Sequence, residues 1–196
     1  MTELARAVAA LRDGGIVCFP TESSYGLAVD PRNESALASL TALKGRAASA
    51  PFALIAGNMA QAKQCTKPWP LAAESLSEQH WPGALTLILP PAAEVGAACI
   101  GPSGGVGLRV SSLEIARDLA LGLGYAITAT SANPSGEPGA QTCEGAKGYF
   151  GSGVAAYLDG GLCSGQPSTL VDFGPEGVVH GRDCRLSRPF VRRFQG

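Results

Sequence analysis

Three short polar strings each end an apolar segment of the chain, and their positions constrain the fold more than any other feature. Residues 20–27 (Pro-Thr-Glu-Ser-Ser-Tyr-Gly-Leu) follow the strand-like run 16–19, and residues 131–136 (Ser-Ala-Asn-Pro-Ser-Gly) follow the strand-like run 126–130. Residues 44–46 (Lys-Gly-Arg) close a helix-like run. Because α/β proteins carry their binding loops at the ends of such segments, we expect the three strings to form one anion-binding site.

The hydrophobic pattern predicts helices and strands that alternate early in the chain. Apolar residues recur at helical spacing, with Thr2, Asn33 and Ser112 as candidate N-caps, in residues 3–12, 34–44, 60–65, 71–80 and 113–123. Further strand-like runs cover residues 51–56, 85–89, 106–110, 154–158, 169–171 and 178–179. The strands crowd together late, which favours a mixed, twisted α/β sheet over a strictly parallel one.

Composition indicates one domain without a membrane role. The chain has 196 residues, 45% of them hydrophobic, which is enough to bury a sizeable core, and no repeat or linker marks a domain boundary. No apolar run approaches the roughly 20 residues that a membrane-spanning helix needs. Residues 1–6 lack the basic segment and apolar core of a secretory signal, so we expect a cytoplasmic protein.

The cysteines and histidines do not indicate a metal site. The six cysteines are scattered, without the close pairs of a zinc site or the density of a disulfide scaffold, so we expect reduced and unreactive thiols. His80 and His180 lie far apart and have no partner at ligand spacing. We therefore expect no metal ion held by the protein itself.

Lys44 and Arg46 are candidates for binding a polyanion. If the chain leaves its helix in an extended conformation, the two side chains project to the same side. Lysine supplies a mobile point charge and arginine a planar fork that suits phosphate oxygens. Two alternatives remain: Lys44 can stabilise the carboxyl end of its helix, and the pair can form a solvated charged loop.

Ser131 and Asn133 form a second candidate pair. Pro134 disfavours the helical conformation for Asn133, so the hydroxyl and the amide should face one way. Together they can donate to and accept from a phosphate, a ribose or an adenine edge. The same string is also typical of a simple turn.

The first string and Arg109 offer further polar groups. Thr21 and Tyr25 lie among several hydroxyl groups, and Glu22 is the single acid of that string, where it could equally cap a turn. Arg109 alternates with apolar neighbours in its strand, so its side chain is either paired inside the protein or directed at a ligand. A P-loop motif and a dinucleotide-binding glycine motif are both absent from the sequence, so any nucleotide must bind in another way.

The carboxyl-terminal segment is the most basic part of the chain. Between Arg182 and Arg193 it carries five arginines against one acid, Asp183. Such a segment attracts nucleic acid through counterion release. A solvated surface tail explains the same composition.

The order and content of these strings resemble the YrdC-like family, in particular its stand-alone bacterial TsaC-type members. The resemblance includes residues 81–86 (Trp-Pro-Gly-Ala-Leu-Thr), 106–110 (Val-Gly-Leu-Arg-Val) and 168–172 (Ser-Thr-Leu-Val-Asp), and it extends from about residue 15 to residue 172. It implies one YrdC-like domain over residues 1–196, with a basic tail from about residue 180. That domain is a twisted, open, mixed sheet with flanking helices and a wide concave pocket.

The resemblance also implies an activity. These family members are L-threonylcarbamoyladenylate synthases, nucleotidyltransferases that convert L-threonine, bicarbonate and ATP with bound Mg²⁺ into threonylcarbamoyl-AMP and pyrophosphate. The product serves a downstream transferase machinery that makes threonylcarbamoyladenosine at position 37 of certain tRNAs. The alternative is a non-catalytic RNA-binding module in tRNA or ribosome maturation.

The family motifs assign roles to individual residues of this chain. Lys44 and Arg46 are expected to neutralise charge at the reacting phosphates. The expected ATP-binding residues are Lys44, Arg46, Ser131, Asn133 and Arg182, with Arg193 as a rival for the last position. The expected threonine-binding residues are Thr21, Tyr25, Arg109 and Ser168.

Overall fold

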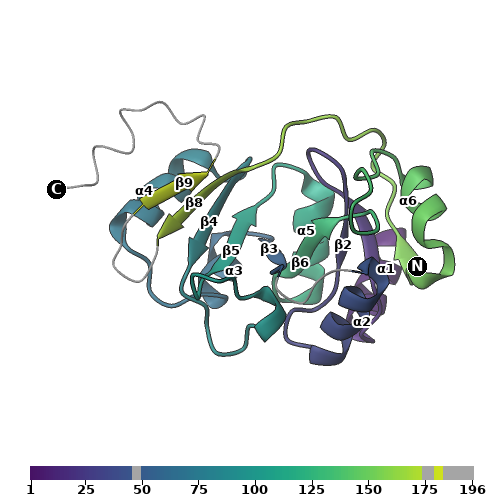
Figure 1. Cartoon of the computed structure of the whole chain (residues 1–196), viewed down its shortest axis with the longest axis horizontal. Helices are drawn as coiled ribbons and strands as arrows, with labels where there is room; N and C mark the ends of the chain where they lie inside the picture. Colours follow the sequence, from purple (N-terminus) through teal and green to yellow (C-terminus); the bar gives the residue numbers. More distant parts are fainter. Residues whose placement is uncertain (46–49, 174–178, 183–196) are drawn as a thin grey trace.

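A mixed β-sheet runs through the length of the protein (Figure 1). The computed structural model describes residues 1–45 and 50–173 and the backbone of residues 179–182. In these residues nine strands follow the order β7-β1-β2-β6-β3-β5-β4-β8-β9. The strands are β1 (Val17–Pro20), β2 (Tyr25–Ala28), β3 (Ala53–Ala56), β4 (Leu85–Leu89), β5 (Val106–Val110), β6 (Ile127–Ser131), β7 (Ala156–Tyr157), β8 (Thr169–Phe173) and β9 (Val179–Arg182). The pairs β1–β7, β3–β5 and β4–β8 are parallel and the others are antiparallel, so the predicted mixed sheet is confirmed.

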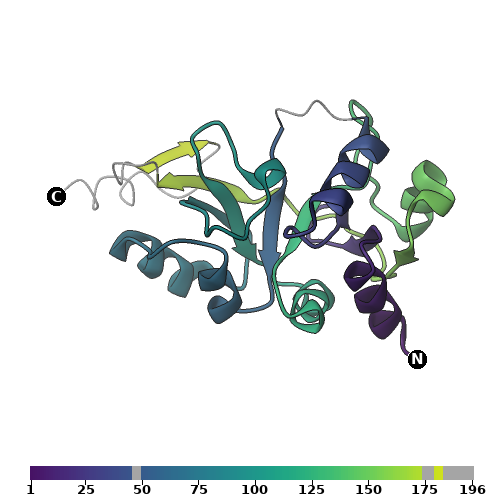
Figure 2. The ribbon, with the colours of Figure 1, turned by 90° about the horizontal axis from the view of Figure 1, so that it is seen from below.

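Helices cover both faces of the sheet. They are α1 (Glu3–Arg12), α2 (Glu34–Lys44), α3 (Met59–Gln64), α4 (Leu71–His80), α5 (Glu114–Leu123) and α6 (Cys143–Phe150), with short 3₁₀ turns at Ala97–Cys99 and Gly151–Gly153. Helices α1 and α5 share one hydrophobic cluster with the sheet, and α2, α3 and α6 share another (Figure 2). Helix α4 packs on β4 and β8 at the far end. Strand β1 shows the consequence: Val17 and Phe19 pack toward α1, and Cys18 packs on the opposite face.

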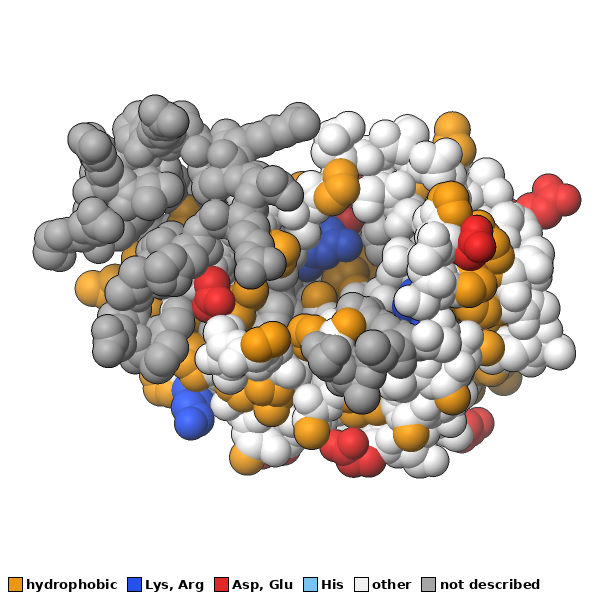
Figure 3. All heavy atoms as spheres, viewed as in Figure 1, with side chains coloured by type: hydrophobic (Ala, Val, Ile, Leu, Met, Phe, Trp, Pro, Cys, Tyr) orange, Lys and Arg blue, Asp and Glu red, His pale blue; other side chains and the backbone are white. Residues whose placement is uncertain are grey.

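One face of the sheet stays open at β3, β4, β5 and β8. Along β4, Leu85, Leu87 and Leu89 pack with α4, whereas Thr86 and Ile88 point into a hollow of about 790 Å³. Successive side chains of a strand point to opposite faces of the sheet, which explains why the residues of β4 alternate between α4 and the hollow. The space-filling view shows a hollowed region in the middle of this face, with basic side chains inside it (Figure 3). A wide concave pocket is what the family resemblance implies, and this hollowed face fits it.

Most predicted elements are confirmed, and so are two of the three predicted caps. Thr2 accepts from the backbone N–H of Ala5, and Asn33 accepts from that of Ala36. The prediction that Ser112 caps α5 is wrong, because that helix begins at Glu114 and its N-cap residue is Leu113. The Ser112 N–H and hydroxyl both donate to Glu22, a residue distant in sequence.

Two elements were not predicted. Residues Tyr25–Ala28 form the buried strand β2, although the sequence places them in a loop. Helix α6 contains two glycines, which weaken its helical pattern, but Thr142 caps it in the ordinary way.

Two other expectations concern the cysteines and the membrane. All five cysteines in the described range are free and buried, and burial raises the pKa of Cys18 to about 12, so this thiol stays protonated and unreactive. In the portion of the chain that the structure covers, no helix is long and apolar enough to cross a membrane.

We predict that Thr128→Val lowers the free energy of unfolding by about 1–3 kcal/mol, because valine keeps the shape but removes a buried acceptor. The Thr128 side chain is fully buried, and its hydroxyl accepts from the backbone N–H of Val29 at 2.8 Å. Urea denaturation measures the loss. Thr41→Val is the control: that hydroxyl bonds the Leu37 carbonyl within α2, so we expect a change within about 0.5 kcal/mol. Equal losses in the two variants would contradict the argument.

Candidate active site

Two cavities at the carboxyl end of β6 share a wall. The smaller, which we call the small cavity, has a volume of about 180 Å³, and the larger, the outer cavity, has about 420 Å³. Residues 129–131 of β6 line both. Sites for drug-sized ligands occupy about 300–1,000 Å³, so the small cavity suits a smaller polar molecule.

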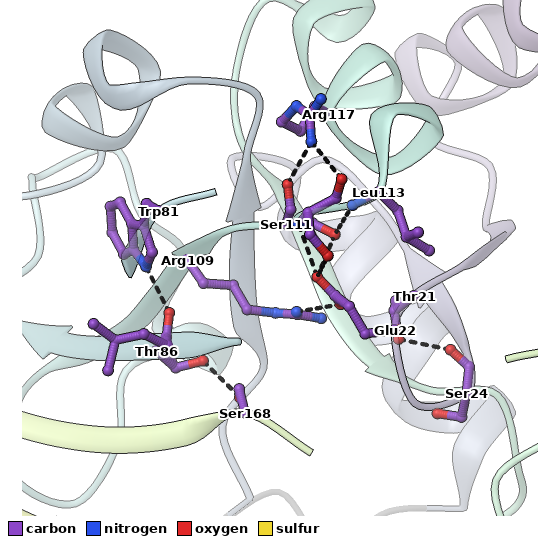
Figure 4. A network of polar contacts seen from close by, with 12 residues as sticks. Thr21, Glu22, Ser24, Trp81, Thr86, Arg109, Ser111, Leu113, Arg117 and Ser168 are labelled. Carbon is purple, nitrogen blue, oxygen red and sulfur yellow. Dashed lines mark hydrogen bonds and ion pairs between the residues drawn. The ribbon is translucent and has the colours of Figure 1, made fainter. Parts of the chain in front are cut away.

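The small cavity gathers every residue that the sequence assigns to threonine binding. The turn between β1 and β2 supplies Thr21, and the first residue of β2 is Tyr25. Strand β5 supplies Arg109, and the chain entering β8 supplies Ser168. Thr21 shapes the turn, because its hydroxyl and its backbone N–H both donate to the Ser24 carbonyl, at 2.6 and 3.0 Å. Figure 4 shows Arg109 and Ser168 on the same side of Thr21, with Ser168 next to Thr86.

An ion pair between Arg109 and Glu22 forms one wall of the small cavity. Arg109 Nη1 donates to Glu22 Oε2 at 2.5 Å, and the two side chains are only 13% and 14% exposed. The other carboxylate oxygen, Oε1, accepts from the Ser111 hydroxyl at 2.8 Å and from the Ser112 N–H at 2.8 Å. The sequence left Arg109 either paired or directed at a ligand, and the structure shows a paired arginine that also lines a cavity.

This environment fixes the charge of Glu22. Burial alone would raise the pKa of its carboxyl, but the charge and hydrogen bond of Arg109 and the hydrogen bond from Ser111 outweigh burial and lower the pKa to about 2. Glu22 is therefore a carboxylate at neutral pH. Such a group is a poor general base, since an efficient base has a pKa near the working pH.

Thr86 holds the hydroxyl of Ser168. The two side-chain oxygens lie 2.8 Å apart, and Thr86 is buried in β4. Strands β4 and β8 are paired in parallel with Leu85 opposite Thr169, which brings the two hydroxyl groups together. The sequence did not identify this partner, although Thr86 lies in one of the family blocks.

Tyr25 is buried, and its hydroxyl fixes the long connection from β7 to β8. It lies 3.0 Å from Asp159 Oδ1 and 2.9 Å from the Gly161 carbonyl, and it accepts from the Gly160 N–H at 3.0 Å. Burial raises the pKa of Tyr25 to about 12, so the phenol stays protonated. The same connection then passes the β1–β2 turn, where the Gly165 N–H donates to the Glu22 carbonyl at 2.7 Å.

Lys44 ties the end of α2 to the loop after β6. It is 4% exposed, and its ammonium donates to the carbonyls of Ser131 and Asn133 at 2.5 and 2.8 Å. The Lys44 carbonyl accepts from the Ser135 N–H at 2.9 Å. Gly45 ends the helix in the left-handed conformation (φ 57°), which glycine adopts without strain. Lys44 therefore brings the second and third polar strings together.

The predicted pair Ser131 and Asn133 lines the outer cavity together with Lys44. The Asn133 amide nitrogen donates to the carbonyls of Pro134 and Glu137, at 2.8 and 2.7 Å, and these bonds fix the orientation of the amide. In the part of the chain that is described, Asn133 Oδ1 is a buried acceptor without a hydrogen-bond partner. A buried acceptor left in this state costs about 1–3 kcal/mol.

Three predicted residues cannot be placed fully. Arg46 and Arg193 lie outside the described residues, and Arg182 is seen only as backbone in β9. The described residues contain no group of three or more His, Cys, Asp or Glu side chains that could hold a metal ion.

The fold and the cavities define an α/β protein with two adjoining polar cavities at the end of one strand. The chain belongs to the Sua5/YciO/YrdC family, whose model, described as telomere recombination, matches residues 9–182. The family expected from the sequence motifs is therefore confirmed.

Several relatives carry the name threonylcarbamoyl-AMP synthase. The one from Halorhodospira halophila is 34% identical over 172 residues, which are 88% of this chain and 90% of that protein. The one from Chromohalobacter salexigens is 36% identical over 175 residues, 87% of this chain and 92% of that protein. The chain is thus similar to these synthases over nearly its whole length and theirs.

Solved structures give the same picture. The crystal structure of P. abyssi Sua5 complexed with L-threonine matches with a TM-score of 0.82 and 32% identity, over 88% of this chain and 52% of the other. This chain therefore spans about half the length of that protein. E. coli YciO matches with a TM-score of 0.77 over 91% of this chain and 88% of its own, but at 23% identity it shows likeness of fold alone.

We predict that Glu22→Gln destabilises the protein in a pH-dependent way. The folded-state pKa of Glu22, about 2, lies below the ordinary value of about 4.3, so the ion pair stabilises the fold above that value. This contribution, on the order of 3 kcal/mol, is lost as the pH falls through the folded-state pKa. Denaturant titrations of the protein and the variant should therefore differ most near neutral pH and converge toward pH 2.

The control for this experiment is an exposed ion pair. Lys63 and Glu74 lie 2.9 Å apart with side chains 50% and 38% exposed. Glu74→Gln should change the free energy of unfolding by about 1 kcal/mol or less. A Glu22→Gln difference that stays constant with pH would show that the carboxylate charge is not what stabilises this wall.

Proposed function

We propose that the protein is a threonylcarbamoyl-AMP synthase. Its reaction joins L-threonine, bicarbonate and ATP, releases pyrophosphate and supplies the precursor for threonylcarbamoyladenosine at position 37 of tRNA. The observation that carries the proposal is the pair of adjoining cavities. The four expected threonine residues line the small cavity, and the expected ATP residues Lys44, Ser131 and Asn133 line the outer cavity. Synthases of matching length support it, as does the neighbouring structure with L-threonine.

The small cavity is the proposed threonine site. A free amino acid carries a carboxylate, and Arg109 presents the one guanidinium of the lining residues. Hydroxyl groups suit the threonine hydroxyl and amine, and Ser168 offers one that Thr86 already holds in place. Tyr25 supports this site by fixing the segment that leads to Ser168.

The outer cavity is the proposed ATP site. Ser131 and Asn133 line this cavity with a hydroxyl and an amide, which suit an adenine edge or a ribose. The Lys44 ammonium places a positive charge at the shared wall, and Arg46 and Arg182 are the proposed further phosphate contacts. The magnesium ion would arrive as part of the substrate, bound to ATP.

The shared wall explains how the two substrates would react. The threonine nitrogen takes up the carbon of bicarbonate with loss of water, which gives a carbamate. A carbamate oxygen then attacks the α-phosphorus of ATP, and the bond to the bridging oxygen of pyrophosphate breaks. The carbamate and ATP are both anions. Most of the catalysis should therefore come from aligning them across the wall formed by Ser131 and from neutralising their charge with nearby cations.

Two further assignments rest on the same proposal. We place the enzyme in the cytoplasm, where its product would pass to the tRNA-modifying transferase. The comparisons lend no support to the non-catalytic RNA-binding alternative. Its sequence basis, the basic tail, falls beyond the described residues.

The test is to incubate the pure protein with ATP, bicarbonate and labelled L-threonine. We expect threonine-dependent release of pyrophosphate and a labelled, adenylated product that mass spectrometry identifies as threonylcarbamoyl-AMP. Omission of bicarbonate should abolish the product. A protein that binds tRNA in a salt-sensitive way but forms no adenylate would instead be the RNA-binding module.

We predict that substitutions in the two cavities separate the two substrates. Arg109→Lys keeps the charge but loses the planar fork, so it should raise the threonine KM about 10-fold or more and leave the ATP KM within about twofold. Asn133→Ala removes an acceptor of the outer cavity and should raise the ATP KM by about 5- to 30-fold instead. Steady-state pyrophosphate release measures both constants. If each variant affected both substrates equally, the assignment of one cavity to each would be wrong.

A further inference from the structure

The carboxylate of Glu22 is anchored independently of Arg109. Its Oε1 accepts from the Ser111 hydroxyl, from the Ser112 N–H and, at 3.1 Å, from the Ser112 hydroxyl. Arg117 in turn holds this segment, since its Nη1 donates to the carbonyls of Ser111 and Ser112 at 2.8 Å each. Figure 4 shows these bonds converging on the turn between β5 and α5. The carboxylate is therefore a fixed point and not a flexible partner.

Arg109 meets this fixed point with one nitrogen. Nη1 donates to Glu22 Oε2, and the guanidinium is planar, with five N–H donors in a rigid arrangement. Fixing Nη1 therefore sets the direction in which the whole guanidinium faces. Without such a partner, a long arginine side chain would lose several rotatable bonds each time it bound a ligand.

We propose that Glu22 is a positioning residue for the threonine site, which holds Arg109 so that its guanidinium faces the small cavity and receives the substrate carboxylate. The inference rests on the proposed function and extends it to Glu22, for which the sequence pattern indicates no role beyond capping a turn. Glu22 acts through Arg109 and does not take part in the chemistry.

The direction in which removal of Glu22 changes threonine binding distinguishes a positioning role from a purely electrostatic one. A carboxylate beside Arg109 weakens the attraction between the arginine and an incoming anion, so on charge alone its removal should tighten threonine binding. If Glu22 positions the arginine, removal should weaken binding. The two accounts therefore predict opposite changes.

Glu22→Gln is the variant that isolates the contact. Its amide oxygen can keep the three donors of Ser111 and Ser112, while its NH₂ group then faces the Nη1 donor of Arg109. We expect the threonine KM to rise about 10-fold or more, with kcat at saturating threonine and the ATP KM within about twofold of the unchanged protein. Calorimetric titration of L-threonine should show the same weakening in the dissociation constant.

A second variant and a control complete the test. Glu22→Asp keeps the charge but shortens the side chain by one methylene, so it should also raise the threonine KM. If the glutamine variant does not fold, the threonine KM of the aspartate variant tests the positioning role. Glu74→Gln, in the exposed pair with Lys63, should leave both KM values unchanged. An unchanged or lower threonine KM in a folded Glu22 variant, or an equal rise in both KM values, would overturn the proposal.

Failure of this proposal is distinct from failure of the proposed function. If the unchanged protein forms no threonylcarbamoyl-AMP, the proposed function is wrong, whatever Glu22 does. If it forms the product and the Glu22 variants bind threonine as tightly as before, the function stands and the positioning role is wrong.

Discussion

Strand β6 is the constraint on which the site depends, because it joins the two halves of the sheet. It pairs antiparallel with β2 through Leu27 opposite Thr130, and with β3 through Ala53 opposite Ala129. Its last residues form the wall between the two cavities. A slip of one residue in either pairing would turn every side chain of β6 to the opposite face, so the register of the sheet fixes both cavities at once.

The site contains buried charges whose arrangement serves geometry more than stability. Lys44 and Glu22 are both largely buried, and each makes several bonds to groups distant in sequence. For the Glu22–Arg109 pair, the cost of removing both charges from water roughly cancels the gain from pairing them, so the pair adds little net stability over two apolar residues. Removal of one partner alone is costly, because the other charge is left buried. They hold polar groups in place before a ligand arrives, which is the arrangement that electrostatic catalysis requires.

The sequence predicted the elements and the meeting of the three strings, because both follow from local patterns. Apolar periodicity gave α2 and β6, and the polar residues at their ends had to lie at the same edge of the sheet. Strand β2 was not predicted, because Tyr-Gly-Leu-Ala is short and contains no β-branched residue. Its pairing with β1 and β6 on either side makes it a strand.

The partners of the site residues could not be predicted, because they are set by tertiary contacts. Glu22 and Arg109 are 87 positions apart, and no spacing rule connects them. Lys44 was expected to face phosphate or to stabilise its helix, yet its ammonium binds carbonyls 87 and 89 positions away. One signal was present: an arginine among apolar strand residues needs an anion, and Glu22 is the one acid of the first string.

The most direct test of the two-cavity account is a crystal structure with L-threonine and a non-hydrolysable ATP analogue bound together. The account predicts the threonine carboxylate on the Arg109 guanidinium in the small cavity, with Glu22 still paired to that arginine. It predicts the nucleotide in the outer cavity, with its α-phosphate beside Ser131 and the rest of the nucleotide against Asn133. Threonine bound away from Arg109, or both ligands in the same cavity, would contradict it.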